Sequence, residues 1–147
     1  MAEKTFSNEI FINAQAARVL DFLEDLMDHD KIHPLIVSVE ELDVAEEQFR
    51  RYQITDRVPM GPFTIKAVYE ADIWRTDDGE LKSIARQSPG VVLHNTTTAT
   101  PENDGTLLRE VVSVKAPFLL QNFTYRQAKE SHQKMFERLK AVLESEQ

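Results

Sequence analysis

The sequence contains no cysteine and only four glycines among its 147 residues. The lack of cysteine excludes disulfides, thiolate metal ligands and a thiol nucleophile. So few glycines disfavour a phosphate-binding loop, and neither G-x-G-x-x-G nor the Walker motif is present. The nucleophile elbow of serine hydrolases, G-x-S-x-G, is missing as well. These absences argue against nucleotide use and against covalent catalysis by serine or cysteine.

Long hydrophobic runs are also missing. No apolar stretch approaches the roughly 20 residues that a membrane-spanning helix needs. The opening residues, MAEKTFSNEIF, contain no apolar run preceded by basic residues, so we expect no signal peptide. The expected location is therefore the cytoplasm, without a membrane span.

Basic residues are scarce, since 17 Lys and Arg stand against 25 Asp and Glu and give a net charge of -8. This balance disfavours a nucleic-acid partner, because phosphate binding needs a basic surface. Between Asp21 and Glu47 the acidic residues are dense, and Lys31 is the only Lys or Arg. We interpret this segment as a solvated acidic face. A protein-interaction module that docks a basic partner on this face is the weaker alternative.

The hydrophobic pattern predicts one α+β domain over residues 1–147. An opening strand has Phe6, Ile10 and Ile12 on one face, and Asn13 can cap a helix over residues 14–27. A short helical turn follows. Period-two alternation then predicts six strands, near residues 36–45, 47–58, 63–75, 81–88, 91–100 and 106–116. The last segment predicts a long helix over residues 118–145. Short connections predict one antiparallel sheet of about seven strands with the helices on one face.

The stretch HDKIH resembles the H-E-x-x-H zinc signature, in which two histidines one helical turn apart bind the metal. However, Pro34 follows at once and disfavours helical geometry, and Asp30 stands where the signature has glutamate. No third ligand follows at the expected distance. We therefore predict no metal and no other cofactor, and interpret the stretch as a hinge from helix to strand with His29 on its exposed side.

Four segments carry a resemblance to a known family: the opening strand running into AQAARVLDFLEDL, the turn KIHPLI, YQITDRVPMGPFTIKAVYEADIW, and the closing VSVKAPFLLQNFTYRQAKESHQKMFERLKAVLE. Their order resembles the helix-grip fold of the START, polyketide-cyclase and birch-pollen-allergen superfamily (SRPBCC). The resemblance covers essentially the whole chain and implies a curved sheet gripping the C-terminal helix, two short N-terminal helices and an internal cavity. Members bind lipids, steroids, polyketides or plant hormones. A minority catalyse cyclisation or dehydration, and some assist chaperones.

A cavity of this kind needs an apolar lining with a few polar groups. Strand alternation and the seam of the last helix give the candidate ligand-binding residues: Tyr52, Ile54, Phe63, Ile65, Tyr69, Ile73, Arg86, Glu110, Val112, Tyr125 and His132, with His33 at the cavity mouth. Glu110 shares its side of the last strand with apolar residues, so it needs a partner or a pKa shifted toward the neutral form. Arg86, His94 and His132 are the candidate partners. The alternative is that Glu110 reaches water at a sheet edge or at the cavity mouth.

Two functions remain open from the sequence. The first is binding or carriage of a small hydrophobic molecule, such as a lipid, polyketide or aromatic compound, by a monomer or weak homodimer. The second is a cyclase or dehydratase in which Glu110, His132 or His94 transfers protons while tyrosine or arginine polarises a carbonyl. Binding is favoured, because no single strand concentrates polar residues.

Overall fold

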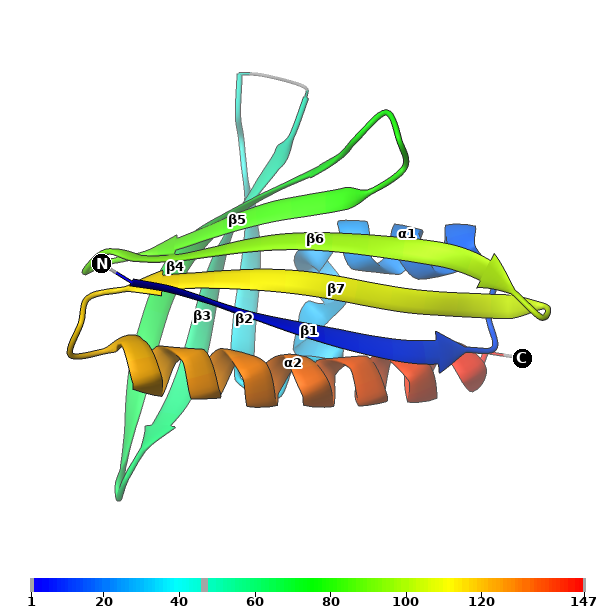
Figure 1. Cartoon of the computed structure of the whole chain (residues 1–147). Coiled ribbons are helices and arrows are strands. Elements are labelled where there is room, and N and C mark those ends of the chain that lie inside the picture. The colour runs from blue at the N-terminus through cyan, green and yellow to red at the C-terminus, as the bar shows by residue number, and fades with distance from the viewer. Residues whose placement is uncertain (1, 46–47, 147) are drawn as a thin grey trace.

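The computed structural model describes residues 2–45 and 48–146. Within these residues the chain forms one antiparallel sheet of seven strands in the order β1-β7-β6-β5-β4-β3-β2. In chain order the elements are β1 (Ala2–Ile12), α1 (Ala16–Glu24), the 3-10 helix η1 (Leu26–Lys31), β2 (Ile36–Leu42), β3 (Arg50–Met60), β4 (Phe63–Arg75), β5 (Leu81–Gln87), β6 (Val91–Glu102), β7 (Gly105–Ala116) and α2 (Gln121–Glu144). The sheet curves around α2, which runs alongside β1 and β7 (Figure 1). The helix-grip architecture predicted from the sequence is confirmed.

The two edge strands, β1 and β2, are consecutive in sequence but lie at opposite edges of the sheet. The connection between them contains α1 and η1. The sequence predicted Asn13 as the cap of this helix, which is wrong. The helix instead begins after Gln15, which makes no side-chain cap, and the backbone N–H of Asn13 donates to Glu144 at 2.9 Å. Asn13 thus ties the end of β1 to the end of α2.

One apolar core fills the space between α1, the C-terminal half of α2 and the sheet. Its centre is formed by side chains that are at most 1% exposed: Ile12, Val19, Leu108, Leu139 and Leu143. Full burial of each such side chain stabilises the fold by about 1.5–3 kcal/mol. This packing fixes α2 at its C-terminal end and leaves the N-terminal half to face a different part of the sheet.

The hairpin between β6 and β7 has the geometry that the sequence PENDG predicts. Asn103 and Asp104 both have positive φ angles, 48° and 68°, as a two-residue turn requires. Gly105 follows, and a Cβ at this position would lie 2.6 Å from the backbone oxygen of Ile12. The close approach of β1 to this hairpin therefore needs glycine.

Several predicted element boundaries differ from the structure. The long helix begins at Gln121 rather than at residue 118, because Leu120 first closes a turn onto the carbonyl of Pro117. Phe118, the first residue of the predicted helix, is 84% exposed, and Leu119 is 90% exposed. The predicted strand start at residue 47 lies outside the described residues. No described helix is long and apolar enough to cross a membrane.

Several acidic residues between Asp21 and Glu47 form ion pairs with basic residues. Arg75 of β4 contacts Asp21 at 3.4 Å and Glu24 at 3.1 Å. Arg50 of β3 contacts Glu41 at 3.2 Å and Asp25 at 3.8 Å, and Lys31 pairs with Asp28. The charge density read from the sequence is therefore reduced at these positions, and the surface pairs themselves add little stability.

Candidate functional site

A cavity of about 310 Å³ lies between the concave side of the sheet, α2 and η1. Most of its lining is apolar: Ile54, Val58, Ala67, Ile73 and Val112 from the strands and Met135 from α2 contribute to it. Its lining also includes Met60 and Ile65 of the β3–β4 hairpin, Pro89 of the β5–β6 turn and Leu120 before α2. These three segments lie at the same end of the molecule (Figure 1), and we assign the mouth to this end.

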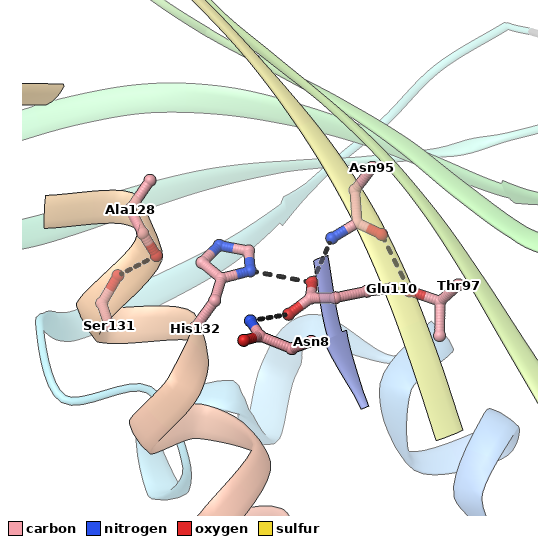
Figure 2. Close-up of polar contacts among 7 residues, drawn as sticks. All are labelled: Asn8, Asn95, Thr97, Glu110, Ala128, Ser131 and His132. Atoms are coloured by element: carbon pink, nitrogen blue, oxygen red, sulfur yellow. Dashed lines mark hydrogen bonds and ion pairs between the residues drawn. The ribbon is translucent and has the colours of Figure 1, made fainter. Parts of the chain in front are cut away.

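A buried polar cluster forms part of the cavity wall, with Glu110 at its centre (Figure 2). The Glu110 side chain is fully buried and accepts hydrogen bonds from three neighbours. Asn8 of β1 donates at 3.0 Å, Asn95 of β6 at 2.7 Å, and Nδ1 of His132 of α2 lies 2.9 Å from Glu110. Thr97 donates to Oδ1 of Asn95, which directs the amide NH₂ of Asn95 toward Glu110. Four secondary-structure elements thus meet at one carboxylate.

Glu110 and His132 form an ion pair at pH values between their two pKa values. Burial by itself would raise the pKa of Glu110, but the charge and hydrogen bond of His132 and the two asparagine amides outweigh it and lower the pKa. Burial would lower the pKa of His132, but the charge and hydrogen bond of Glu110 and the charge of Asp56 raise it. Of the partners considered for Glu110, the structure supplies His132.

The other ring nitrogen of His132 has no partner among the residues that the structure describes, and His132 lines the cavity. Because Glu110 holds Nδ1, the neutral ring carries its lone pair on Nε2, and the protonated ring carries an N–H there. His132 lies twelve residues along α2 from Leu120 at the mouth, or about 18 Å at 1.5 Å per residue. The arrangement can exchange hydrogen bonds or protons with a molecule deep in the cavity.

A second acid in the cavity, Asp56, was not predicted. The hydroxyl of Tyr69 on β4 donates to Asp56 on β3 at 3.3 Å. Burial raises the pKa of Asp56 to about 6, against the opposing effects of the Tyr69 hydrogen bond and the charge of His132. The sequence did carry a signal for it: Asp56 shares its side of the strand with Ile54 and Val58, as Glu110 does with its apolar neighbours.

The two histidines of HDKIH both line the cavity, and the prediction that His29 is exposed is wrong. Each is 8% exposed. Burial lowers the pKa of His29 to about 4 and the pKa of His33 well below its ordinary value. His29 stacks on Phe22 with ring centroids 6.2 Å apart, and His33 packs edge-to-face on His132 at 5.8 Å. The 3-10 helix η1 packs against β2, and His29 within it and His33 just after it both face the cavity.

Most of the predicted ligand-binding residues line the cavity. The structure places Ile54, Ile65, Tyr69, Ile73, Glu110, Val112, His132 and His33 in its wall. Side-chain alternation along β3, β4 and β7 and the seam of α2 were sufficient to identify all of them except His33. The prediction of His33 at the cavity mouth is wrong, because His33 packs against His132 deep in the cavity. Their part in binding a ligand stays a prediction.

Five other predicted residues lie elsewhere. Arg86 points away from Glu110 and pairs with Asp72 at 3.1 Å, and His94 is exposed. Both positions occupy the side-chain row opposite to the inward-facing Ala85 and Asn95. Phe63 is 72% exposed at the hairpin tip.

The remaining two, Tyr52 and Tyr125, are packed rather than cavity-lining. Tyr52 is fully buried in the core near α1 and η1, with its OH unpartnered within the described chain. Tyr125 packs against Phe6 of β1 at 5.9 Å, on the side of α2 that faces the sheet edge. Both lie on faces that a sequence pattern identifies only as apolar.

Metal binding finds no support in the side-chain arrangement. No group of three or more His, Asp or Glu in residues 2–45 and 48–146 is arranged to hold a metal ion. His33 packs edge-to-face on His132, and His29 stacks on Phe22.

The comparisons with known proteins identify a family and a fold. A model of the family described as "Domain of unknown function (DUF7053)" matches residues 10–145. A search of curated proteins finds no match. A START superfamily protein from Mycobacterium smegmatis superposes with a TM-score of 0.80 and 13% identity over 97% of this chain and 99% of that one. Zhui aromatase/cyclase from Streptomyces sp. R1128 matches at a TM-score of 0.81 and 12% identity, over 97% and 94% of the two chains.

A third structure, a protein from Thermus thermophilus, has a TM-score of 0.78 and 18% identity over 97% of this chain and 98% of that one. At these identities the likeness concerns the fold. It is the SRPBCC fold that the sequence predicted.

Proposed function

The chain belongs to the DUF7053 family, whose description assigns no function, and we propose that it binds a small hydrophobic molecule in the cavity between the sheet and α2. The observation that carries the proposal is the cavity of about 310 Å³, which is apolar along most of its wall and has a polar cluster within it. This combination suits a small apolar ligand that carries one or two polar atoms. The fold shared with a START superfamily protein supports the same function.

The driving force for binding would be burial of apolar surface, which contributes about 25 cal/mol per Å². Ile54, Val58 and Ala67 provide such a surface on one wall, and Met135 and Phe136 of α2 provide it on the other. The exposed side chains of Met60 and Ile65 at the mouth give a ligand an apolar route into the cavity.

Binding can be tested with a neutral fluorescent probe, N-phenyl-1-naphthylamine, and with native mass spectrometry of the purified protein. We expect saturable fluorescence enhancement and a co-purified small molecule that competes with the probe. Ala67→Phe should fill the cavity from β4 and abolish binding. Val68→Phe, one residue further along and 44% exposed, is the matched control and should leave binding intact. Absence of both a co-purified molecule and probe binding would contradict the proposal.

A second candidate function is acid–base catalysis of the cyclase or dehydratase type. Two observations favour it. Nε2 of His132 has no partner among the described residues while Glu110 holds Nδ1, and the charge of His132 acts on Asp56, a second acid in the cavity wall. The Zhui aromatase/cyclase shares the fold. Once a bound molecule is identified, its conversion by wild type and by His132→Gln is compared. Loss of turnover with unchanged affinity supports catalysis, whereas unchanged chemical composition after prolonged incubation with wild type supports binding alone.

We further propose that residues 1–147 act as a single domain in the cytoplasm, as a monomer or weak homodimer. The continuous sheet and its shared core support the single domain. Sedimentation equilibrium over a range of concentrations tests the oligomeric state, and a tight dimer would contradict it.

A further inference from the structure

The two acids of the cavity differ in their partners. Glu110 pairs with His132 at 2.9 Å, whereas Asp56 receives only the neutral hydroxyl of Tyr69, at 3.3 Å, among the described residues. The charge of His132 acts on Asp56 as well as on Glu110, so the three groups lie within electrostatic reach of one another. The charge of the His132 imidazolium is therefore already balanced by Glu110, and Asp56 adds a second negative charge within its reach.

No other cation of the described chain enters this end of the cavity. His29 and His33 stay neutral near pH 7, because burial lowers the pKa of both. Arg138 lies close enough to affect His33, but it is exposed on α2 and is not part of the cavity wall.

Lys82 is the only Lys or Arg among the described residues of the cavity wall. It lies opposite Trp74 and Thr96 in the sheet. Its neighbours Leu81 and Ser83 also line the cavity, and side chains alternate along a strand, so the Lys82 side chain belongs to the opposite face. It cannot serve as the counter-ion of a deeply bound anion.

One ring nitrogen is available to a neutral polar group. Nε2 of His132 has no partner in the described part of the chain, and His132 lines the cavity. A ligand oxygen can form a hydrogen bond with this nitrogen inside the cavity.

From this distribution of groups we infer that the cavity takes a ligand whose polar group is an uncharged oxygen, as in an alcohol, a phenol or a ketone, and discriminates against a free carboxylate. The inference rests on the proposed binding function and narrows its ligand class. Neutral His132 accepts a hydrogen bond from a ligand hydroxyl at Nε2, and protonated His132 donates one to a hydroxyl or ketone oxygen. A ligand carboxylate would face Glu110 and Asp56 without a cation of its own.

The test compares ligands that share one skeleton: naphthalene, 2-naphthol and 2-naphthoate, measured by displacement of N-phenyl-1-naphthylamine near pH 7.5. We expect 2-naphthol to bind more tightly than naphthalene, and 2-naphthoate to bind about tenfold or more weakly than 2-naphthol. Decanol and decanoate repeat the comparison with a flexible chain. Equal or tighter binding of the two carboxylates would overturn the inference and leave the proposed function standing. Failure of all five compounds and of the probe to bind would contradict the proposed function itself.

Variants locate the effect. His132→Leu should remove the advantage of 2-naphthol over naphthalene while naphthalene still binds, and His94→Leu on the outer face should change neither. Asp56→Asn removes one negative charge and should narrow the gap between 2-naphthol and 2-naphthoate. If His132→Leu fails to fold, the Asp56→Asn comparison still decides, because an unchanged gap would contradict the electrostatic origin of the selectivity.

Discussion

Replacement of Glu110 by glutamine is the most direct test of the buried polar cluster. Glu110 accepts hydrogen bonds from Asn8, Asn95 and His132, whereas glutamine offers one acceptor oxygen and adds an NH₂ donor. Thr97 fixes the orientation of the Asn95 amide, so its NH₂ group still points at residue 110. In Glu110→Gln the oxygen can still accept from Asn95 and His132, but the new NH₂ group faces the NH₂ group of Asn8. The Asn8 amide must then turn over or stay unsatisfied, and an unsatisfied donor costs about 1–3 kcal/mol.

Loss of the ion pair adds a contribution that depends on pH. The pKa of His132 is raised above its ordinary value of 6.5, so its contribution to stability is complete below pH 6.5 and is lost as the pH rises through the folded-state pKa. The pKa of Glu110 is lowered below 4.5, so its contribution is complete above pH 4.5 and is lost as the pH falls through the folded-state pKa. Both are complete between these two values. Removing one partner of a buried pair costs about 3–5 kcal/mol, and we expect that loss near pH 5.5. Near pH 8.5 we expect a smaller loss, because the contribution of His132 declines once the pH passes 6.5; the limit with neutral His132 is about 1–3 kcal/mol, the cost of an unsatisfied donor.

Urea unfolding followed by the fluorescence of Trp74, the only tryptophan, measures these differences at both pH values. The slope of free energy against urea should be unchanged, so that a shift in midpoint reports stability. Glu130→Gln, on the exposed side of α2, is the matched control and should change the free energy of unfolding by no more than about 0.5 kcal/mol. A loss below about 1 kcal/mol near pH 5.5, or a loss larger near pH 8.5 than near pH 5.5, would refute the assignment of a buried ion pair.

Three further substitutions test other features of the structure. Gly105→Ala places a Cβ 2.6 Å from the backbone oxygen of Ile12 and should lower the free energy of unfolding by about 1–3 kcal/mol in urea titrations. Burial raises the pKa of Asp56 from 3.8 to about 6, so the wild type loses stability as the pH rises between these values. Asp56→Asn should therefore raise the free energy of unfolding by roughly 1–3 kcal/mol above pH 6 and change it little below pH 4. Burial lowers the pKa of His29 from 6.5 to about 4, so the wild type loses stability as the pH falls through this range; His29→Phe should raise the melting temperature at pH 5 relative to the wild type more than at pH 7.5.

Each of these expectations has a contrary outcome. An unchanged urea midpoint for Gly105→Ala would mean that β1 does not approach the hairpin so closely. A pH-independent effect of Asp56→Asn would remove the evidence that this carboxyl is desolvated. A uniform effect of His29→Phe at both pH values would show that packing, rather than neutral burial of the imidazole, dominates at this position.

The architecture was predictable because local patterns and turn chemistry agree along the chain. Alternation identifies β4 and β7, and the sequence PENDG predicts the turn at Asn103 and Asp104. The start of α2 was misplaced because Phe118 and Leu119 are apolar and continue the helical period. Their exposure follows from the turn in which Leu120 N–H donates to the carbonyl of Pro117. Hydrophobicity alone does not reveal such a backbone turn.

The site was predictable where one periodicity decides the side-chain direction. Glu110 and His132 were identified on the inward side of a strand and on the seam of a helix, and the structure places them 2.9 Å apart. The prediction for Arg86 was wrong because β5 is short and its alternation weak, so its face was ambiguous. His29 was misjudged because a 3-10 helix of six residues is too short for its three-residue period to reveal a buried side.

The contact between Asn8 and Glu110 has a consequence for how the chain assembles. The two residues lie directly opposite each other in the pairing of β1 with β7, although 102 residues separate them in sequence. A shift of β1 by one residue would turn Asn8 to the other face of the sheet, and Glu110 would lose the hydrogen bond that Asn8 donates. The cluster thus favours a single register for an edge strand, and removal of β1 should disable the site.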